Sequence, residues 1–232
     1  MRIEGEKALI TGGAEGLGFS LAKEFLTRGA SEVIICGRNF DKLGAASKKL
    51  KDSKLKIVVC DVSNPGSVDA MATSIDRIGI LVNNAGVFLD GNLEGYSDED
   101  ISKVIDSNLK GTIFMTKAFL PRMLRDKKGV IVNISSTSGL DPRHNQSVYV
   151  ASKYGVTGFT RTLRLDLEGT GVRVIGVYPG GMATKLFEKA GSTIDSGEFI
   201  PTDEMAKQIV ANLETKSPMV VDEIVIRREK RS

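Results

Sequence analysis

Cysteine and histidine are scarce in this chain of 232 residues, and their scarcity excludes several kinds of site. The two cysteines, Cys36 and Cys60, lie near the ends of separate apolar runs and show neither a disulfide framework nor metal-site spacing. We therefore expect buried thiols in a reducing compartment. The single histidine, His144, argues against a metal centre and against a Ser-His-Asp triad.

Long hydrophobic runs and a strong charge imbalance are also missing. No apolar run approaches the length of a membrane span, and the first seven residues lack the apolar core of a signal peptide. The net charge of +3 is too small to indicate binding to nucleic acid or to a membrane. With 41% apolar and 26% charged residues, the composition is typical of a soluble globular protein, and we expect a cytoplasmic one.

Short β-rich runs alternate with longer helical patterns along the chain, which indicates βαβ units and a parallel sheet. The expected strands cover residues 7–11, 33–36, 56–60, 80–83, 130–134, 172–177 and 219–225. The expected helices cover a stretch after residue 18, residues 40–51, a stretch from Pro65, residues 100–125 with a bend near Asn108, residues 149–168 and residues 202–213. Ser97 and Thr202 are the expected N-caps of two of them. We predict a doubly wound, Rossmann-type α/β fold, a three-layer sandwich around a parallel seven-stranded sheet, with residues 1–232 in one domain.

Tyr149 and Lys153 lie four residues apart in a helical pattern. Four residues on a helix turn through roughly 400° and rise about 6 Å, so the two side chains share a face. A phenol has a pKa of about 10, and a neighbouring ammonium favours the phenolate and lowers that pKa. Ser136, thirteen residues before Tyr149, offers a hydroxyl to the same site. This pattern predicts a proton-transfer site, and a tyrosine and a lysine on a solvated helix face are the alternative reading.

A glycine-rich turn, Thr-Gly-Gly-Ala-Glu-Gly-Leu-Gly at residues 11–18, joins the first strand to the first helix. Glycines let the backbone approach a pyrophosphate, and the helix N-terminus offers free N–H groups beside it. The position between a strand and an amphipathic helix favours a phosphate-binding turn over a purely structural loop.

Together these motifs resemble the short-chain dehydrogenase/reductase family from about residue 7 to residue 225. The residues that carry the resemblance are Thr11, Gly12, Gly16 and Gly18 of the Thr-Gly-x-x-x-Gly-x-Gly motif, Asn83 to Gly86 of Asn-Asn-Ala-Gly, Asp61-Val62, Asn108, Ser136, Tyr149-x-x-x-Lys153, and Pro179-Gly180-x-x-x-Thr184. We expect one dinucleotide-binding catalytic domain.

The resemblance implies an NAD(P)(H)-dependent oxidoreductase that transfers a hydride between nicotinamide and a secondary alcohol or carbonyl. Ser136 would donate a hydrogen bond to the substrate oxygen, and Tyr149 would act as general acid or base. By the same resemblance Lys153 would bind the nicotinamide ribose, and Asn108 would hold a water that links Lys153 to solvent. The implied cofactor-binding residues are Gly12, Gly16, Leu17, Gly18, Arg38, Asp61, Val62, Asn84, Ala85, Gly86, Tyr149, Lys153, Pro179, Gly180 and Thr184.

The end of the second strand bears on the choice between NAD(H) and NADP(H). Selection of NAD uses a carboxylate there to bind the ribose 2′-hydroxyl, whereas this chain has Gly37 followed by Arg38. A guanidinium suits a 2′-phosphate. Glu15 in the glycine turn would repel that phosphate, and Asp41 lies one helical turn too late for the ribose. The residue types favour NADP(H).

The substrate pocket is expected in residues 87–96, 140–148 and 182–201, and the last of these segments would be a lid. For His144, Asn145 and Gln146, contact with the substrate and a place in a simple surface loop are both open readings. Ser138 competes with Ser136 for the catalytic role and is disfavoured by its spacing to Tyr149. The resemblance implies a small-molecule alcohol or carbonyl substrate and a homodimer or homotetramer. A non-catalytic dinucleotide sensor and a purely structural domain are the alternative functions.

Overall fold

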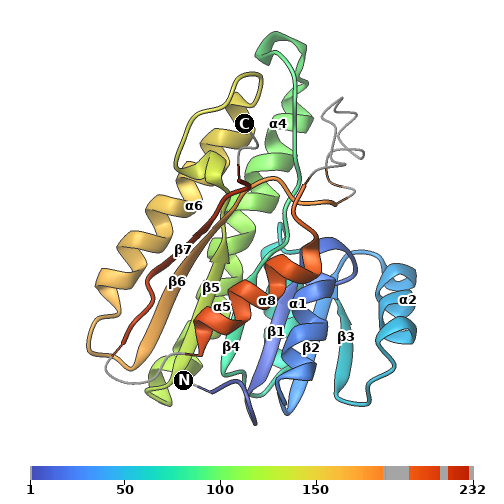
Figure 1. Ribbon diagram of the computed structural model, residues 1–232, viewed down its shortest axis with the longest axis vertical. Coiled ribbons are helices and arrows are strands. Elements are labelled where there is room, and N and C mark those ends of the chain that lie inside the picture. Colours follow the sequence, from blue (N-terminus) through green and yellow to red (C-terminus); the bar gives the residue numbers. More distant parts are fainter. Residues whose placement is uncertain (1, 185, 187–198, 215–218, 230–232) are drawn as a thin grey trace.

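The computed structural model describes residues 2–184, 186, 199–214 and 219–229, and its centre is a sheet of seven parallel strands (Figure 1). The strands are β1 (Lys7–Thr11), β2 (Glu32–Gly37), β3 (Leu55–Val59), β4 (Ile80–Asn83), β5 (Gly129–Ile134), β6 (Val172–Pro179) and β7 (Glu223–Ile226). Their order in the sheet is β3-β2-β1-β4-β5-β6-β7. The order reverses between β1 and β4, where a doubly wound sheet opens a crevice for a ligand. The predicted fold class is confirmed.

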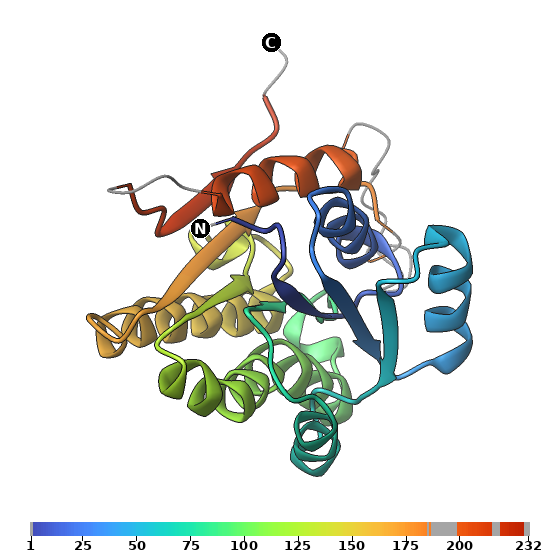
Figure 2. The same ribbon diagram turned by 90° about the horizontal axis from the view of Figure 1, so that it is seen from below.

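Helices cover both faces of this sheet (Figures 1 and 2). One apolar cluster joins the sheet to α1 (Gly16–Thr27), α2 (Phe40–Leu50) and α8 (Thr202–Leu213). A second cluster, on the other face, joins it to α3 (Pro65–Ser74), α5 (Gly111–Arg125) and the end of α6 (Ser147–Asp166). The short turns η1 (Leu93–Gly95) and η3 (Thr137–Gly139) and the helix α4 (Asp98–Ile105) lie between these elements. Among the described residues, no helix is long and apolar enough to cross a membrane.

Polar side chains fix where several helices begin. Asn39, Asn64 and Ser97 each accept a hydrogen bond from a backbone N–H three residues further on, in α2, α3 and α4 respectively. Such a cap stabilises a helix by about 1 kcal/mol. Pro65 is the first residue of α3, where its missing N–H costs no hydrogen bond. The predicted start of α3 and the Ser97 cap are therefore correct.

The predicted cap at Thr202 is wrong. Pro201 takes the N-cap position of α8 and Thr202 is the first helical residue. The Thr202 hydroxyl instead accepts a hydrogen bond from Ser20 Oγ at 2.9 Å, and Ser20 Oγ also lies 2.6 Å from Asp203 Oδ1. These contacts hold the start of α8 against α1, a tertiary role that the sequence pattern does not contain.

The predicted bend near Asn108 is a π-helical turn. α4 ends at Ile105, residues Asp106–Lys110 form the turn (η2), and α5 continues from Gly111. A Cβ on Gly111 would lie 2.8 Å from Val62 Cγ2, so glycine allows the start of α5 to pack closely against the loop after β3. The turn points the buried Asn108 side chain at residue 87, beside the predicted site.

Candidate active site

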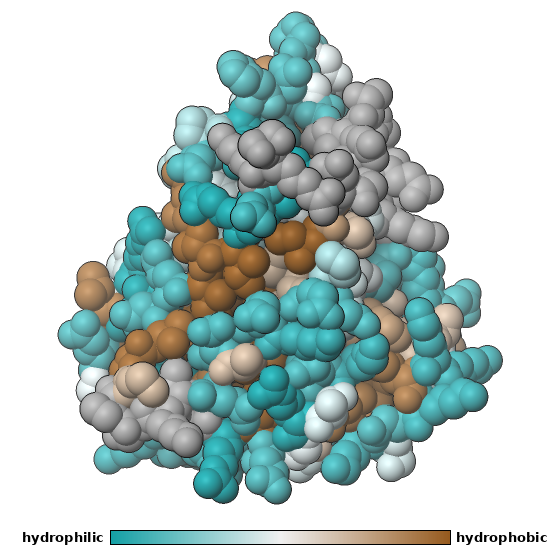
Figure 3. Space-filling model, in the orientation of Figure 1, coloured by the Kyte–Doolittle hydropathy of each residue, from teal (hydrophilic) through white to brown (hydrophobic). Residues whose placement is uncertain are grey.

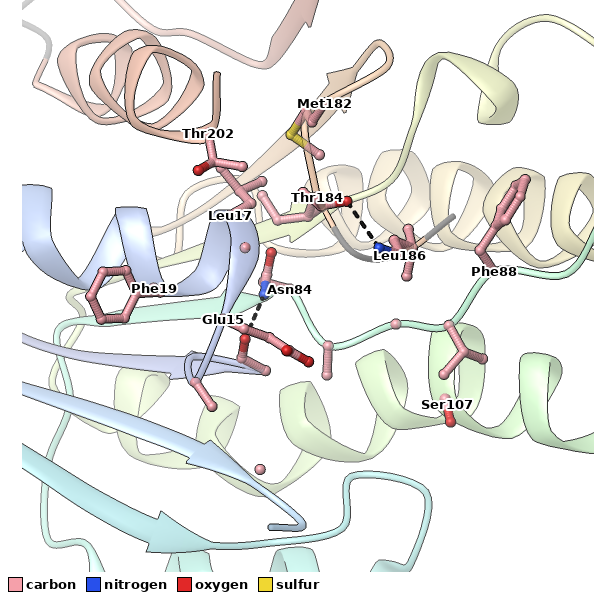
Figure 4. Close-up of a pocket in the computed structure, with 18 of the residues that line it drawn as sticks. Glu15, Leu17, Phe19, Asn84, Phe88, Ser107, Met182, Thr184, Leu186 and Thr202 are labelled. Atoms are coloured by element: carbon pink, nitrogen blue, oxygen red, sulfur yellow. Dashed lines mark hydrogen bonds between the residues drawn. The ribbon is translucent and has the colours of Figure 1, made fainter. Parts of the chain in front are cut away.

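A cleft of about 1150 Å³ is lined by residues that follow the ends of β1 to β6 (Figure 4). Twelve of the residues predicted to bind cofactor or to act in catalysis line it: Gly12, Gly16, Leu17, Arg38, Asp61, Val62, Asn84, Ala85, Gly86, Tyr149, Lys153 and Thr184. Segments that are far apart in the sequence thus meet in one cavity. Of the remaining predicted residues, Gly18, Asn108, Ser136, Pro179 and Gly180 lie outside its lining.

The glycine turn lies close to the backbone of the loop after β4, at the N-terminal end of α1. Gly12 has a φ of +65°, and a Cβ there would lie 2.9 Å from Ala85 Cα. A Cβ on Gly18 would lie 2.3 Å from the Gly12 carbonyl oxygen, so Gly18 serves packing behind the turn. The N-cap residue Glu15 makes no side-chain cap hydrogen bond to α1, which leaves the first N–H groups of the helix for an anionic ligand. This cradle fits the pyrophosphate of a dinucleotide.

Thr11 and Asn84 hold the turn in place. Thr11 Oγ1 accepts hydrogen bonds from the backbone N–H groups of Asn84 and Ala85, both at 2.9 Å. The Asn84 side-chain amide donates to the carbonyl oxygens of Thr11 at 2.9 Å and of Gly12 at 3.3 Å. The Asn84 side chain therefore positions the turn.

Charged side chains gather at the end of the cleft beyond β2 and β3. Arg38, Lys42 and Glu15 line this end, and Lys42 Nζ lies 3.8 Å from Glu15 Oε1. Both members of that pair are about half exposed, at 52% and 46%. Asp61 Oδ1 accepts hydrogen bonds from the N–H and hydroxyl of Ser63, at 2.9 and 2.7 Å, which orient its carboxylate.

Tyr149 and Lys153 meet in the wall of the cleft on the first turns of α6. Both are buried, with 7% and 6% of their surface exposed. Lys153 Nζ donates to the Ile134 carbonyl oxygen at 3.0 Å and lies 5.8 Å from the centre of the Tyr149 ring. Ser136 lies near enough for its hydroxyl to influence the pKa of the Tyr149 phenol, although Ser136 itself is not part of the lining. Ser136, Tyr149 and Lys153, which the sequence predicted to share a site, lie near one another in the structure.

The expected lowering of the Tyr149 pKa is wrong for the protein alone. Burial raises the pKa of Tyr149 to about 12, and the nearby Ser136 hydroxyl only partly opposes this. Burial also lowers the pKa of Lys153 to about 8, because a dry environment disfavours its charged form. The Lys153 ammonium is engaged by the Ile134 carbonyl rather than by the phenol, so desolvation outweighs it.

Asn108 joins α6 to the loop after β4. Its amide nitrogen donates to the Val87 carbonyl oxygen at 2.9 Å and to Ser152 Oγ at 3.0 Å, and its Oδ1 accepts from the Val87 N–H at 2.8 Å. A Cβ on Gly86 would lie 3.1 Å from Asn108 Oδ1 and 3.8 Å from Lys153 Nζ. Asn108 therefore lies beside Lys153, with both amide hydrogens already used.

The serines around Ser136 have supporting contacts. Ser135 Oγ donates to the Lys153 carbonyl oxygen at 3.0 Å, which ties the end of β5 to α6. The backbone N–H of Ser138 donates to Ser136 Oγ at 3.1 Å and so orients that hydroxyl. Pro179 ends β6, and the Gly180 N–H donates to the Ile226 carbonyl oxygen at 2.8 Å. These last two residues position the following turn.

Apolar side chains line the cleft beside Tyr149. The Phe88 and Tyr149 rings pack edge to face with centroids 4.8 Å apart. Met182 and Leu186 come from the turn after β6, where the Leu186 N–H donates to Thr184 Oγ1 at 3.3 Å (Figure 4). Most of the predicted 182–201 lid, namely 185 and 187–198, lies outside the described residues. Within 140–148, residues 141–145 are exposed and do not line this cleft.

The sequence patterns missed several cleft residues, among them Lys42 and Cys60, whereas Phe88 lies in the expected pocket segment 87–96. Cys60 directly precedes the predicted Asp61, so proximity to a motif was the available signal for it. Lys42 had no such signal, because a lysine one turn into a helix is usually solvated.

The chain belongs to the short-chain dehydrogenase family, since a family model described as short chain dehydrogenase matches residues 6–195. An uncharacterized oxidoreductase of Staphylococcus epidermidis is 32% identical over 97% of this chain and 98% of its own length. The 3-oxoacyl-[acyl-carrier-protein] reductase FabG of Thermotoga maritima is 34% identical over 97% of both chains. The protein is thus an oxidoreductase of this family.

Solved structures agree with this assignment and show which nucleotides the relatives hold. A closed form of serine dehydrogenase complexed with NADP+ has a TM-score of 0.87 at 31% identity and covers 95% of this chain, with 94% of its own chain covered. A 3-ketoacyl-(acyl-carrier-protein) reductase from Brucella melitensis complexed with NADH has a TM-score of 0.87 at 27% identity, with 97% of each chain covered. Nicotinamide nucleotides of both kinds are bound on this fold.

Proposed function

We propose that this protein transfers a hydride between NADP(H) and a secondary alcohol or carbonyl substrate. One observation carries the proposal: Tyr149 and Lys153 line the same cleft as the glycine turn at the start of α1. A phosphate-binding turn by itself needs no proton-transfer group. Finding a buried phenol near the Ser136 hydroxyl in the same cavity supports reduction and oxidation at a carbon–oxygen bond.

Different residues of the cleft would bind different parts of the cofactor. The first N–H groups of α1 would bind the pyrophosphate, Asp61 and Val62 would flank the adenine, and Lys153 would hold the nicotinamide ribose. When bound, the nicotinamide supplies or accepts the hydride. Pro179, Gly180 and Thr184 would shape the turn beside it.

Side chains of the protein would supply and transfer the proton. Ser136 would donate a hydrogen bond to the substrate oxygen as negative charge develops there, and Tyr149 would give that oxygen its proton. A dry site favours the neutral phenol, which is the proton-donating form, and the pKa of about 12 keeps it protonated at neutral pH. Asn108, beside Lys153, would hold the water that returns a proton from solvent. In the oxidation direction the same groups would act in reverse.

Preference for NADP(H) rests on charge at the far end of the cleft. Arg38 and Lys42 are two cations in the lining, and the Lys42 ammonium lies close enough to Glu15 to offset its carboxylate. The repulsion that Glu15 would exert on a 2′-phosphate is thereby reduced. Dissociation constants for NADPH and NADH, measured by nucleotide fluorescence, test this preference, and tighter binding of NADH would contradict it.

The catalytic assignment is tested by Tyr149→Phe, with Tyr154→Phe on the same helix as the matched control. Tyr154 is 43% exposed and its hydroxyl donates to the Leu140 carbonyl oxygen, so its loss leaves the cleft unchanged. We expect Tyr149→Phe to bind NADPH normally and to lower turnover by at least about 10²-fold, as loss of a general acid does. Turnover is followed by nicotinamide absorbance over a panel of ketones and secondary alcohols.

A non-catalytic dinucleotide sensor is the competing function, and the same panel separates the two. NADPH binding by the wild-type protein without turnover of any substrate would favour the sensor. Turnover retained by Tyr149→Phe would remove Tyr149 from the chemistry. The apolar groups beside Tyr149 support a small substrate with an apolar part. We further infer one catalytic domain, a cytoplasmic location and a homodimer or homotetramer.

A further inference from the structure

Two free thiols lie together under the Arg38 end of the cleft. Cys36 is in β2, Cys60 directly follows β3, and both are buried and reduced. The sheet register pairs Cys36 with Val58, two residues before Cys60. Because side chains alternate along a strand, Cys36 and Cys60 point to the same face, and both belong to the same apolar cluster.

The two thiols differ in their readiness to react. The neighbouring Cys36 thiol, with help from Ser67, lowers the pKa of Cys60 to about 7. The proximity of Cys60 and complete burial raise the pKa of Cys36 well above its ordinary value. Cys60 also lines the cleft, whereas Cys36 lies behind it. Since the thiolate is the reactive form, Cys60 is the nucleophile and Cys36 the partner that follows.

Both cysteines are attached to the parts that would hold a dinucleotide. The Cys36 carbonyl oxygen accepts hydrogen bonds from the N–H groups of Gly12 at 2.8 Å and Gly13 at 3.3 Å. The Cys60 N–H donates to the Gly37 carbonyl oxygen at 3.0 Å, and Asp61 follows Cys60 in the cleft wall. A shift of the Cys36 backbone would therefore move the glycine turn, and a shift of the Cys60 backbone would move the cleft wall at Asp61.

We propose that Cys36 and Cys60 are a peroxide-oxidisable thiol pair whose disulfide weakens dinucleotide binding, and that a bound dinucleotide slows its formation. The Cys60 thiolate attacks hydrogen peroxide, the O–O bond breaks, and Cys60 becomes a sulfenic acid as one water is released after protonation. The Cys36 sulfur then attacks Cys60, the S–O bond breaks, and the leaving hydroxide takes the Cys36 proton to form a second water. Two thiols lose two electrons and one peroxide gains them.

The disulfide changes the site because it shortens the Cα–Cα distance between Cys36 and Cys60. From strand spacing and rise, diagonal partners on neighbouring strands lie about 8 Å apart at Cα. A disulfide requires about 4.4 to 6.8 Å. Cys60 lies just beyond the end of β3, so closure draws it toward β2 and takes Asp61 and Val62 with it. The wall proposed to flank the adenine then no longer fits.

The first test treats the reduced wild-type protein with hydrogen peroxide and needs no substrate. We expect an intact mass lower by about 2 Da, a peptide that joins residues 36 and 60, and reversal of both by dithiothreitol. The dissociation constant for NADPH should rise about tenfold or more, as loss of one or two polar contacts implies, and should recover on reduction. Absence of the linked peptide, or an unchanged dissociation constant in the oxidised protein, overturns the proposal.

Variants and ligand protection separate this inference from the proposed function. In Cys36→Ala the second thiol is absent, so the peptide that joins residues 36 and 60 should not form, and a sulfenic acid at Cys60 should persist and be trapped by dimedone. In the wild-type protein, saturating NADP+ should slow formation of the linked peptide several-fold, and an unchanged rate counts against protection. Failure of the reduced protein to bind NADPH contradicts the proposed function, while the mass measurement still reports on the thiol pair.

Discussion

Burial governs the chemistry of Tyr149 and Lys153 more than their spacing does. The four-residue interval was sufficient to predict that they share a face of α6. It did not predict that desolvation would raise the pKa of Tyr149 to about 12 and lower that of Lys153 to about 8. Burial of this pair arises from side chains such as Phe88, which come from other elements and have no fixed separation in sequence.

Lys153→Met is expected to stabilise the cofactor-free protein at neutral pH. The pKa of Lys153 is about 8 when folded and 10.5 when unfolded, so between these values the unfolded chain binds more protons and stability rises with pH. The whole penalty, about 3 kcal/mol, therefore acts at pH 7. Loss of the hydrogen bond to Ile134 returns about 1 kcal/mol, and we expect a net gain of roughly 2 kcal/mol.

Urea unfolding of the wild-type protein and Lys153→Met from pH 7 to pH 10 checks this expectation. The difference in free energy of unfolding should shrink as the pH rises through 8 and toward 10. Lys117→Met, on the exposed side of α5, is the control and should change stability by less than about 0.5 kcal/mol at each pH. A difference that is constant with pH would show that Lys153 is not the titrating group.

Glu15 and Lys42 are expected to tune the choice of nucleotide in opposite directions. Glu15→Gln removes the negative charge near the proposed 2′-phosphate and should tighten NADPH binding about two- to fivefold, which is the size of an exposed ion-pair effect. Lys42→Met should weaken it by a similar factor. NADH lacks the 2′-phosphate and serves as the control ligand. Equal changes for both nucleotides in fluorescence titrations would contradict the charge argument.

At the scale of elements, the contact between α1 and the end of β1 depends on a missing side chain. A Cβ on Gly18 would lie 2.3 Å from the Gly12 carbonyl oxygen and 2.6 Å from the Asn84 amide nitrogen. Gly18→Ala should therefore destabilise the fold by about 1 to 3 kcal/mol, as overpacking does, and weaken NADPH binding by shifting the turn.

Gly44→Ala in α2 is the matched control for that substitution. Among the described residues, a Cβ on Gly44 would meet nothing within 4 Å, and the change should stabilise the protein by about 0.5 to 1 kcal/mol through helix propensity. Thermal melts and nucleotide titrations of the two variants provide the comparison. A Gly18→Ala protein as stable as Gly44→Ala would mean that the turn relaxes easily.

Elements were predicted best where their signals are local. The caps at Ser97 and the proline at the start of α3 use contacts within four residues, so the sequence pattern contains them. The start of α8 does not, because its Thr202 hydroxyl bonds to Ser20 on α1. The Asn84 contacts with the glycine turn were equally invisible, since they span more than seventy positions.

At the scale of the whole molecule, hydrophobic surface gathers at one edge of the sheet. Figure 3 shows it over β6 and β7, between α6 and α8. Met219, Val220 and Val225, in or near the edge strand β7, are 63%, 63% and 41% exposed. On α6, Leu165 is 66% exposed. Apolar surface of this kind marks contact sites, and β7 has no further strand beside it in the described sheet.

The strand order and layers followed from the alternation of β and α patterns, because parallel strands require crossover helices on both faces. Exposure at the sheet edge did not follow, because a buried strand and an edge strand in contact with another subunit have the same apolar composition. The predicted homodimer or homotetramer therefore depends on a property of the assembled surface rather than on a motif.

A homo-oligomer at micromolar concentration is expected from this surface, and Leu165→Glu tests one of its faces. A charge at a side chain that is 66% exposed costs the monomer little, but it opposes burial of α6 against a second copy. The control is Leu93→Glu, at a position that is 57% exposed in η1 and belongs to neither α6 nor β7. Light scattering should show a smaller assembly for Leu165→Glu and an unchanged one for Leu93→Glu, with both variants melting as the wild-type fold does. A monomeric wild-type protein, or equal assemblies for all three, would show that the exposed face of α6 is not used for self-association.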